Sequence, residues 1–271
     1  MKYKIGIMQG RLVRREIKSR LQSFPWKNWR NEIVLAKKYK INFIEWTLDY
    51  KDFYKNPLIK YPFLVKKILN KNNIKTESVT CDFFMQRPPF HKKKYKTTEF
   101  LLKLISVSRV VGIKYIVIPL VDNSSLKNIK NKKKIISYFK QFQKINKSNK
   151  VKIIFEFDLK PKKVIQFINK LDNSFGINYD LGNSAFYRHN FEEEKKYFYR
   201  VFNIHLKDRN RAGQSVLFGK GLVKFHEFFK FLNKIKYKNL LILQSFIPSN
   251  NNVVINTMQN YKFIKKIYEK K

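Results

Sequence analysis

Residues 151–180 read VKIIFEFDLKPKKVIQFINKLDNSFGINYD, and this stretch decides the fold. Its first and last six residues are short apolar runs, and the segment between them has the apolar spacing of a helix. Strand, helix and strand in that order are typical of a parallel βαβ unit, in which the helix covers one face of the sheet. The two runs end in carboxylates, Glu156 and Asp180. We therefore expect two acidic side chains at the same edge of a parallel sheet.

The same alternation extends through the chain of 271 residues. We predict eight strands, near residues 3–8, 42–46, 75–81, 114–119, 151–156, 175–180, 201–206 and 240–244. We predict eight helices, near residues 27–40, 61–73, 97–112, 126–147, 161–171, 191–199, 222–236 and 252–269. This is the pattern of an α/β protein with a single (β/α)8 TIM barrel, for which about 250 residues is typical. No linker rich in Pro, Gly or Ser divides residues 1–271, and no GxGxxG follows the first run, which disfavours a Rossmann-type sheet.

Composition indicates a protein of a reducing compartment without a membrane partner. Hydrophobic residues make up 44% of the chain, which is enough for a sizeable core. No apolar run approaches the roughly 18 residues that a membrane span requires, and the start, MKYKIGIMQGRL, becomes strand-like too early for a signal peptide. One cysteine, Cys81, excludes an internal disulfide. We therefore expect a cytoplasmic protein.

The net charge of +40, from 59 Lys and Arg against 19 Asp and Glu, suggests a nucleic-acid partner at first. The lysines are, however, spread over the predicted helices and their ends instead of forming one basic arm. They accompany much Asn, Ile, Phe and Tyr, as A/T-rich codons would produce. We therefore expect a solvated basic surface that attracts anionic small molecules, without a specific nucleic-acid site.

Four polar residues stand at the carboxyl ends of the last four predicted strands: Glu156, Asp180, His205 and Gln244. In a barrel these ends meet at one mouth, so the four side chains predict a site for one divalent cation, Mn, Mg, Co or Zn. A single such residue is more often a helix cap or a satisfied polar group, but four in register favour a site. Gln244 can offer an amide oxygen to a metal, yet it cannot take a proton at neutral pH.

The segment QGRLVRREIKSRLQSFP, residues 9–25, is long for a connection between a strand and a helix. It follows the first predicted strand, on the same face as the four polar strand ends. Long loops there usually shape a substrate pocket, so Gln9, Arg11 and Gln22 are candidate pocket residues. A surface loop without a role in the pocket is the alternative.

Several segments resemble one known superfamily, the xylose isomerase-like TIM barrels. They are GIMQGRL (6–12), QSFPW (22–26), FIEWTLD (43–49), TCDFFMQRPP (80–89), FEFDL (155–159), NYDLGNSA (178–185), HLKDR (205–209) and FGKG (218–221). The superfamily is described as sugar phosphate isomerases and epimerases, and it includes ketose epimerases, hydroxypyruvate isomerases, inosose dehydratases and endonuclease IV. The resemblance spans nearly the whole chain and implies a metal site, without naming the substrate.

The resemblance also implies roles for single residues. The sugar epimerases hold one metal with Glu, Asp, His and Glu, and both Glu residues move protons at the substrate carbon. Glu156, Asp180 and His205 match the first three positions, and Gln244 stands in place of the second Glu. Epimerisation by two bases therefore requires another partner for Glu156.

Candidates for that partner lie at other strand ends. Glu45 ends the second predicted strand, and Lys207 follows His205 by two residues on the same side of an extended strand. Arg209 and Arg211 are candidates for holding an anionic substrate group. Arg211 also matches the position, six residues after the ligand His, where the resembling epimerases place an Arg, although six is also the spacing of an ordinary surface loop. A salt bridge between Lys207 and Asp208, or a helix cap, is the alternative for those two residues. For Cys81 and Asp82 we expect core packing and capping.

Asn183 argues against a nuclease, because the epimerases and endonuclease IV carry a His at the matching position. Endonuclease IV assembles three metals with many imidazoles. This chain has four His, and His91, His189 and His226 fall in predicted loops or helices. A trinuclear site cannot be built from them.

The combined prediction is an enzyme, a metal-dependent isomerase or epimerase, or a related lyase, acting on a sugar or sugar phosphate through an enediolate. Glu156 or Glu45 would remove the proton, with Lys207 as a further candidate base. The remaining pocket candidates would bind the substrate: Gln9, Arg11, Asn183, Arg209 and Arg211. A non-catalytic metal- or carbohydrate-binding barrel and, third, a nucleic-acid-binding protein are the alternatives. We also keep a homodimer as an expectation.

Overall fold

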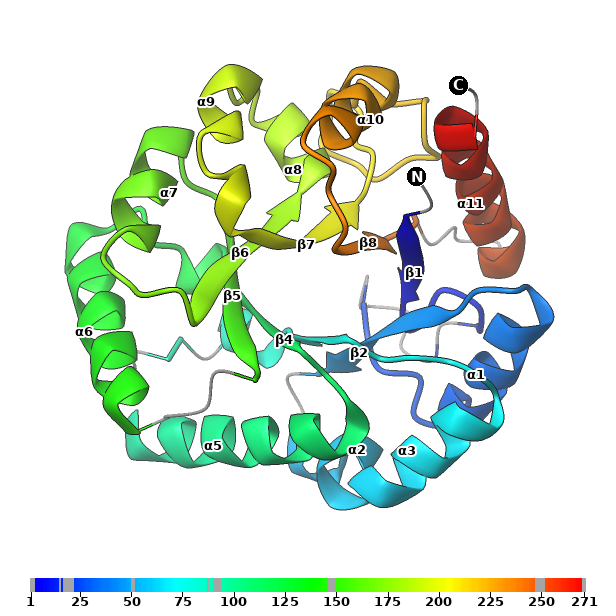
Figure 1. The fold of residues 1–271 in the computed structure, drawn as a ribbon, viewed down its shortest axis with the longest axis horizontal. Coiled ribbons are helices and arrows are strands. Elements are labelled where there is room, and N and C mark those ends of the chain that lie inside the picture. The colour runs from blue at the N-terminus through cyan, green and yellow to red at the C-terminus, as the bar shows by residue number, and fades with distance from the viewer. Residues whose placement is uncertain are drawn as a thin grey trace.

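Eight parallel strands form a closed barrel in a computed structural model of the chain, and each strand pairs with its neighbours in sequence (Figure 1). The structure describes residues 3–14, 16, 22–49, 52–86, 88–89, 94–145, 150–246 and 252–269. The strands are β1 (Lys4–Met8), β2 (Phe43–Leu48), β3 (Ser78–Cys81), β4 (Tyr115–Leu120), β5 (Lys152–Phe157), β6 (Phe175–Asp180), β7 (Val201–Leu206) and β8 (Leu240–Leu243). β8 pairs with β1 and closes the ring, so the predicted (β/α)8 TIM barrel is confirmed.

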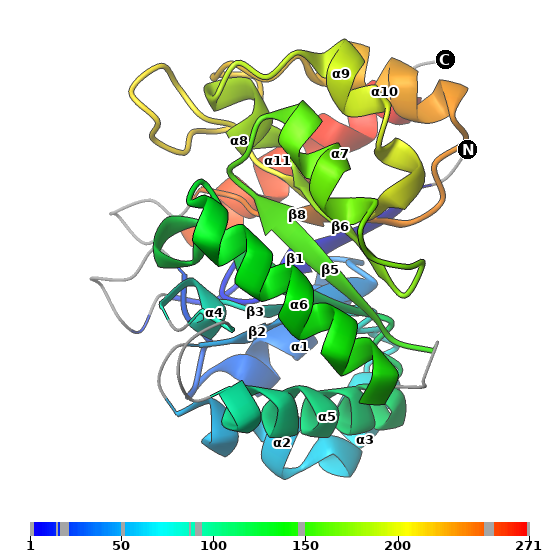
Figure 2. The ribbon, with the colours of Figure 1, turned by 90° about the vertical axis from the view of Figure 1, so that its left-hand side faces the viewer.

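Longer helices surround the barrel, as Figures 1 and 2 show. They are α1 (Trp29–Lys38), α3 (Pro62–Lys71), α5 (Lys94–Val111), α6 (Ile129–Ile145), α7 (Pro161–Ile168), α10 (Phe225–Lys234) and α11 (Val253–Glu269). Their apolar faces pack against the outward side chains of the strands and form the main core. None of these described helices is long and apolar enough to cross a membrane.

Several short elements were not predicted, because three to six residues are too few to show a helical period. They are η1 (Phe53–Lys55), α2 (Pro57–Lys60), α4 (Phe83–Gln86), η2 (Asp122–Ser124) and α8 (Leu181–Phe186). The predicted helix 191–199 is divided into α9 (Phe191–Lys195) and η3 (Phe198–Arg200). The predicted strand at 75–81 begins only at Ser78, since Lys75 makes an isolated bridge to Phe43.

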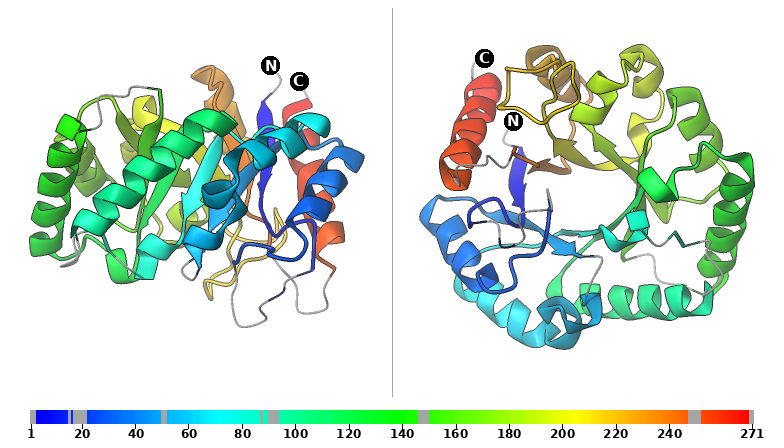
Figure 3. Two further views of the ribbon diagram at one scale, coloured as in Figure 1. Left: turned by 90° about the horizontal axis from the view of Figure 1, so that it is seen from below. Right: turned by 180° about the vertical axis from the view of Figure 1, so that it is seen from behind.

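The interior of the barrel is lined by both apolar and polar side chains. Met8, Leu240 and Ile242 form a small cluster inside the ring, with Phe43 and Tyr115 packed against it. Other interior positions, which usually hold branched apolar residues, are polar and buried. They include Glu45, Ser78, Asn178, Asn203 and His205. The right-hand view of Figure 3 looks onto the carboxyl ends of the strands, where the loop after β7 lies.

Candidate active site

Three donor side chains converge at the carboxyl end of the barrel. Glu156 lies in β5, Asp180 ends β6 and His205 lies in β7, and all three are buried. One ligand atom from each lies within 4.8 Å of the others. The register of β6 and β7 sets Asp180 beside His205, and Glu156 Oε2 lies 3.2 Å from His205 Nδ1. The structure therefore brings together three of the four predicted metal ligands.

The ring of His205 is held from behind by Glu45. His205 Nε2 lies 2.8 Å from Glu45 Oε1. The other oxygen of Glu45 accepts hydrogen bonds from Ser78 Oγ at 2.7 Å and from Asn203 Nδ2 at 2.8 Å. With Nε2 directed to a carboxylate, Nδ1 is the ring nitrogen that faces Glu156, and Asn178 Nδ2 lies 3.1 Å from it. Metal-binding histidines are usually oriented by a carboxylate in this way.

The charges of the cluster shift the pKa values of its members. Burial raises the pKa of Glu156, but His205 and Lys207 outweigh burial and leave this pKa below its ordinary value. Burial raises the pKa of Asp180 above its ordinary value, and the charge of Glu156 adds to the rise. Burial lowers the pKa of His205, but Glu45 and Glu156 outweigh it, so this pKa lies well above its ordinary value. The cluster therefore attracts positive charge.

Two buried oxygens of the site find no hydrogen-bond partner among the described residues, Asp180 Oδ2 and Gln244 Oε1. Asp180 Oδ1 accepts the N–H of Asn183 at 2.7 Å, whereas Lys207 Nζ lies 3.9 Å from Oδ2, too far for a hydrogen bond. In the described part of the chain, Asp180 Oδ2 is the one carboxylate oxygen in this condition. A buried acceptor without a donor is costly, and a bound cation would remove that cost.

A chain of three side chains orients the Gln244 amide. Gln22 Nε2 donates to Asp82 Oδ2 at 2.6 Å, so Gln22 must turn its oxygen toward Gln244. Gln244 Nε2 donates to that oxygen at 3.1 Å. The Gln244 oxygen is thereby the free atom, and it directly follows β8, beside the strand that carries His205. Two carboxylates, an imidazole and this amide oxygen suit a divalent cation.

Asn183 connects the cluster to a cation on the loop after β7. Its Nδ2 donates to Glu156 Oε1 at 3.3 Å, and its Oδ1 accepts from Arg209 Nη1 at 2.8 Å. The guanidinium of Arg209 also lies over the ring of Phe186, 4.0 Å from its centre. Arg211 is exposed two residues further along the loop. The structure thus brings Arg209 to the cluster, whereas the predicted substrate contact of Arg211 stays a prediction that this placement does not favour.

Lys207 and Asp208 contact different partners, so they do not form with each other the salt bridge that the sequence suggested as an alternative. Lys207 points to Asp180, while the Asp208 carboxylate accepts the backbone N–H groups of Gly219, Gly221 and Val223 at 2.9 to 3.1 Å. A Cβ at Gly221 would collide with Asp208. The FGKG motif is therefore explained by a loop that folds tightly around one buried carboxylate.

The segment after β1 supplies buried polar groups on the other side of the mouth. Arg11 is buried and donates to Ser245 O at 2.9 Å, to Gln9 O at 3.3 Å and to Gln22 Oε1 at 3.3 Å. Gln9 Oε1 accepts the N–H of Thr47 at 2.9 Å. All three pocket candidates of this segment are therefore described residues that take part in one network around the mouth.

Cys81 and Asp82 lie at the end of β3 in different surroundings, although the sequence favoured structural roles for both. Cys81 is fully buried in the main core, and burial raises the pKa of its thiol well above the ordinary value, in agreement with packing. Asp82 directly precedes α4, and its carboxylate accepts hydrogen bonds from Gln22 Nε2 and, at 3.1 Å, from Thr80 Oγ1. These contacts go beyond the capping role that the sequence favoured. His91 lies outside the described residues.

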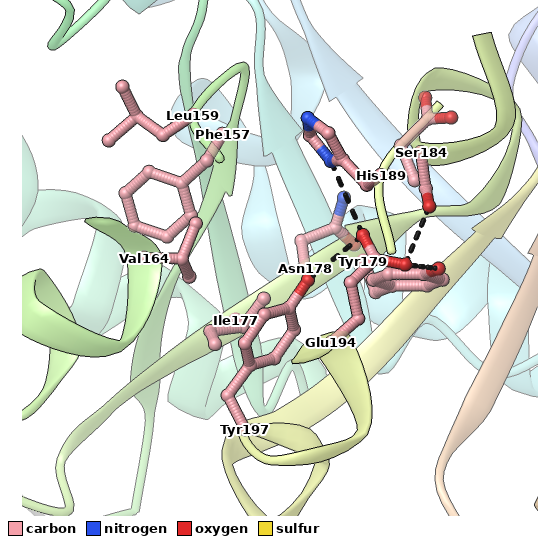
Figure 4. Close-up of a pocket in the computed structure, with 11 residues that line it drawn as sticks. Phe157, Leu159, Val164, Ile177, Asn178, Tyr179, Ser184, His189, Glu194 and Tyr197 are labelled. Atoms are coloured by element: carbon pink, nitrogen blue, oxygen red, sulfur yellow. Dashed lines mark hydrogen bonds and ion pairs between the residues drawn. The ribbon is translucent and has the colours of Figure 1, made fainter. Parts of the chain in front are cut away.

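A second cluster around a buried carboxylate, Glu194, lies on the outer face of β6, and the sequence did not point to it. Figure 4 shows the side chains of Tyr179, Ser184, His189 and Tyr197 around it. Glu194 accepts from Tyr179 and Ser184 at 2.7 Å and from Tyr197 at 3.2 Å, and His189 Nδ1 lies 3.4 Å away. Burial and the Glu194 charge raise the pKa of both tyrosines, which keeps their hydroxyls as donors. No regular spacing relates these residues in the sequence.

Comparison with known sequences agrees with this geometry. The sequence model of the family described as xylose isomerase-like TIM barrel matches residues 33–267. A Haemophilus influenzae protein, SgbU, named as a candidate L-ribulose-5-phosphate 3-epimerase, is 31% identical over 104 residues. That match covers 35% of this chain and 36% of the Haemophilus protein, so the chain matches about a third of that relative's length.

Solved structures resemble the whole barrel. The IolI protein with bound zinc has a TM-score of 0.75 and 14% identity, and the match covers 98% of each chain. D-Allulose 3-epimerase from Methylomonas sp. has a TM-score of 0.74 and 14% identity, again over 98% of each chain. At such low identity the likeness shows the fold alone.

Proposed function

Because this chain belongs to the xylose isomerase-like TIM barrel family, we propose that it is a metal-dependent isomerase or epimerase of a sugar or sugar phosphate. The observation that carries this proposal is the buried cluster of Glu156, Asp180 and His205 with an open carboxylate oxygen. The substrate class rests on the names of relatives, one for a ketose phosphate and one for a ketose.

One divalent ion, Mn, Mg, Co or Zn, would be held by Glu156, Asp180, His205 and the oxygen of Gln244. The zinc in the IolI structure supports this class of ion. A cation bound there supplies Lewis acidity to a sugar carbonyl and its neighbouring hydroxyl, which acidifies the C–H bond beside the carbonyl. Glu45 contacts the ring nitrogen of His205 opposite to the one that faces Glu156, so we assign Glu45 to positioning the imidazole instead of proton transfer.

Glu156 is the proposed base. Its Oε2 is occupied by Asn178 Nδ2 at 2.9 Å and by His205, whereas its Oε1 has only the long contact to Asn183. Because its pKa lies below the ordinary value, the carboxylate is ionised at neutral pH and can accept the C–H proton. The product of that step is an enediolate of the sugar.

Cationic side chains around the mouth would hold an anionic substrate group or the developing oxyanion. Lys207 and Arg209 lie beside Asp180 and Asn183, and Arg11 lies near Gln244, where it donates to Ser245 O and Gln22 Oε1. Gln9 and Asn183 offer amide groups for sugar hydroxyls. Burial lowers the pKa of Arg11 to about 10, which leaves it charged at neutral pH. An anionic group on the substrate, such as a phosphate, would therefore be attracted to these cationic side chains.

The test is turnover of ketoses and their phosphates by the metal-reconstituted protein, followed by NMR or chromatography of the sugars. Glu156→Gln should lower the rate by about 10²–10⁴, since it removes the base. Glu192→Gln is the matched control, because Glu192 is an exposed carboxylate, with 77% of its side chain accessible, and should leave the rate unchanged. Full turnover by Glu156→Gln would refute the assigned role.

The second candidate is a non-catalytic barrel that binds a metal or a carbohydrate, and Gln244 favours it because an amide cannot replace a catalytic carboxylate. Saturable sugar binding by calorimetry, without turnover of any sugar in the panel, would select this candidate. A homodimer, a cytoplasmic location and the lack of specific nucleic-acid binding stay predictions from the sequence.

A further inference from the structure

The carboxylate of Asp82 directly follows the inner face of β3 at the carboxyl end of the barrel. Alternate residues of a strand point to the same side, so Ser78, Thr80 and Asp82 share one face. Ser78 Oγ donates to Glu45 inside the barrel, and Thr80 Oγ1 donates to Asp82 Oδ1. These two hydrogen bonds place Asp82 on the inner side, above the layer that holds His205.

The strand register aligns Asp82 with Glu156 along the hydrogen-bonding direction, which is tilted relative to the barrel axis. Thr80 pairs with Val117 of β4, and Pro119 of β4 pairs with Glu156. Two residues beyond Thr80 and one beyond the end of β3, Asp82 is therefore in register with Pro119, which separates it from Glu156. Neighbouring strands lie about 4.8 Å apart, so the two acidic residues are about 10 Å apart at their Cα atoms. A sugar carbon held over Pro119 would lie between two carboxyl groups.

The same carboxylate is connected to the residue that replaces the second Glu of the epimerases. Gln22 joins Asp82 to Gln244 through its two amide atoms, and Arg11 also donates to Gln22. Gln22 and Thr80 thus hold Asp82, and Gln22 is held in turn by Gln244 and Arg11, which gives the Asp82 carboxyl a defined direction at the mouth.

The surroundings of Asp82 favour its protonated form. Burial raises the pKa of Asp82 to about 7, with contributions from Asp49, Glu156 and Glu45 against the Thr80 hydrogen bond. Asp82 can therefore donate a proton near neutral pH.

We propose that Asp82 is the second proton-transfer residue of this site and acts on the opposite face of the sugar carbon from Glu156. This inference rests on the proposed function. Glu156 takes the C–H proton, and the electron pair of that bond forms the C=C of the enediolate. Asp82 then gives its proton to the same carbon from the other side, and the carbonyl is restored. In the reverse direction the two residues exchange roles, and both equilibrate with solvent between turnovers.

The experiment compares conversion with hydrogen exchange in D2O for wild type and Asp82→Asn, starting from each epimer separately. Wild type should interconvert the epimers and label both with deuterium at the reacting carbon. Asp82→Asn should lose about 10²–10⁴-fold in conversion, yet it should still exchange the proton of the epimer that Glu156 serves. A residue that only supports the fold would lower conversion and exchange together.

The controls separate this inference from the function beneath it. Asp52→Asn removes a carboxylate that is 54% exposed and should match wild type. Asp82→Ser, with a small hydroxyl, replaces Asp82→Asn if that variant does not fold. Conversion by either variant at the wild-type rate overturns the role of Asp82 alone, as does loss of exchange from both epimers with metal still bound. Absence of conversion and exchange in wild type overturns the proposed function, and this inference with it.

Discussion

The two faces of β6 carry two buried carboxylate clusters of similar composition and opposite character. On the inner face, Asn178 and Asp180 point to Glu156 and His205, and one Asp180 oxygen has no donor among the described residues. On the outer face, Glu194 is surrounded by three hydroxyl donors and an imidazole (Figure 4). One cluster has more acceptors than donors, and the other has a donor for each oxygen.

This difference shows that a buried carboxylate near a histidine does not identify a site. A carboxylate that is fully hydrogen-bonded stabilises the packing of the elements that supply its donors. A carboxylate that is buried with an open oxygen requires a cation or a ligand. The inner cluster therefore predicts the binding of a cation or a ligand, and the outer cluster predicts a contribution to the stability of the fold.

Removing ligands from the inner cluster should have the largest effect. The double variant Asp180→Ala, His205→Ala should lose the bound divalent ion and, with it, turnover. Removing His189 from the outer cluster by His189→Ala should leave the metal content at one ion per chain. Metal analysis after chelation and reconstitution measures both. Unchanged metal in the double variant would break the distinction between the clusters.

Removing the outer carboxylate should affect stability instead. Glu194→Ala leaves buried hydroxyls of Tyr179 and Ser184 without their acceptor, and each such group costs about 1–3 kcal/mol. We expect the free energy of unfolding to fall by about 3 kcal/mol, as urea denaturation would measure. Metal affinity of the folded fraction should not change. A loss of metal with unchanged stability would contradict the structural role.

Glu45→Gln tests whether the residue behind the imidazole positions it or moves protons. Loss of an oriented carboxylate behind a metal-binding His typically weakens the metal by about 10–100-fold. If Glu45 acts through His205, turnover at saturating metal should be largely retained while the metal Kd rises. A fall in saturated turnover as large as that of Glu156→Gln would assign the base to Glu45.

Gln244→Glu should have the smallest effect on the inner cluster. An anionic oxygen in place of a neutral amide should tighten the metal by about tenfold, equivalent to about 1.4 kcal/mol. The metal-free protein should lose about 1 kcal/mol, because Gln244 no longer donates to Gln22. Calorimetric titration measures the metal affinity, and urea unfolding measures the stability of the metal-free protein. Weaker metal binding would exclude Gln244 as a ligand position.

Sequence patterns predicted the barrel and the meeting of three polar strand ends for one physical reason. Apolar runs with period two and helical segments with period 3.6 define the βα units, and parallel strands must deliver their carboxyl ends to one mouth. Glu156, Asp180 and His205 each end or nearly end a strand, so their meeting follows from topology. The family prediction was confirmed by the match over residues 33–267.

Tertiary structure alone decided which polar groups pair. Glu45 lies 160 residues from His205, and Gln22 lies 222 residues from Gln244, so no local pattern relates them. Arg209 instead of Arg211 reaches Asn183 because the loop after β7 folds around Asp208. A polar side chain at a strand end carries no mark of its partner in the sequence. Strand register and loop path determine whether it is satisfied, as in the outer cluster, or left open to a ligand.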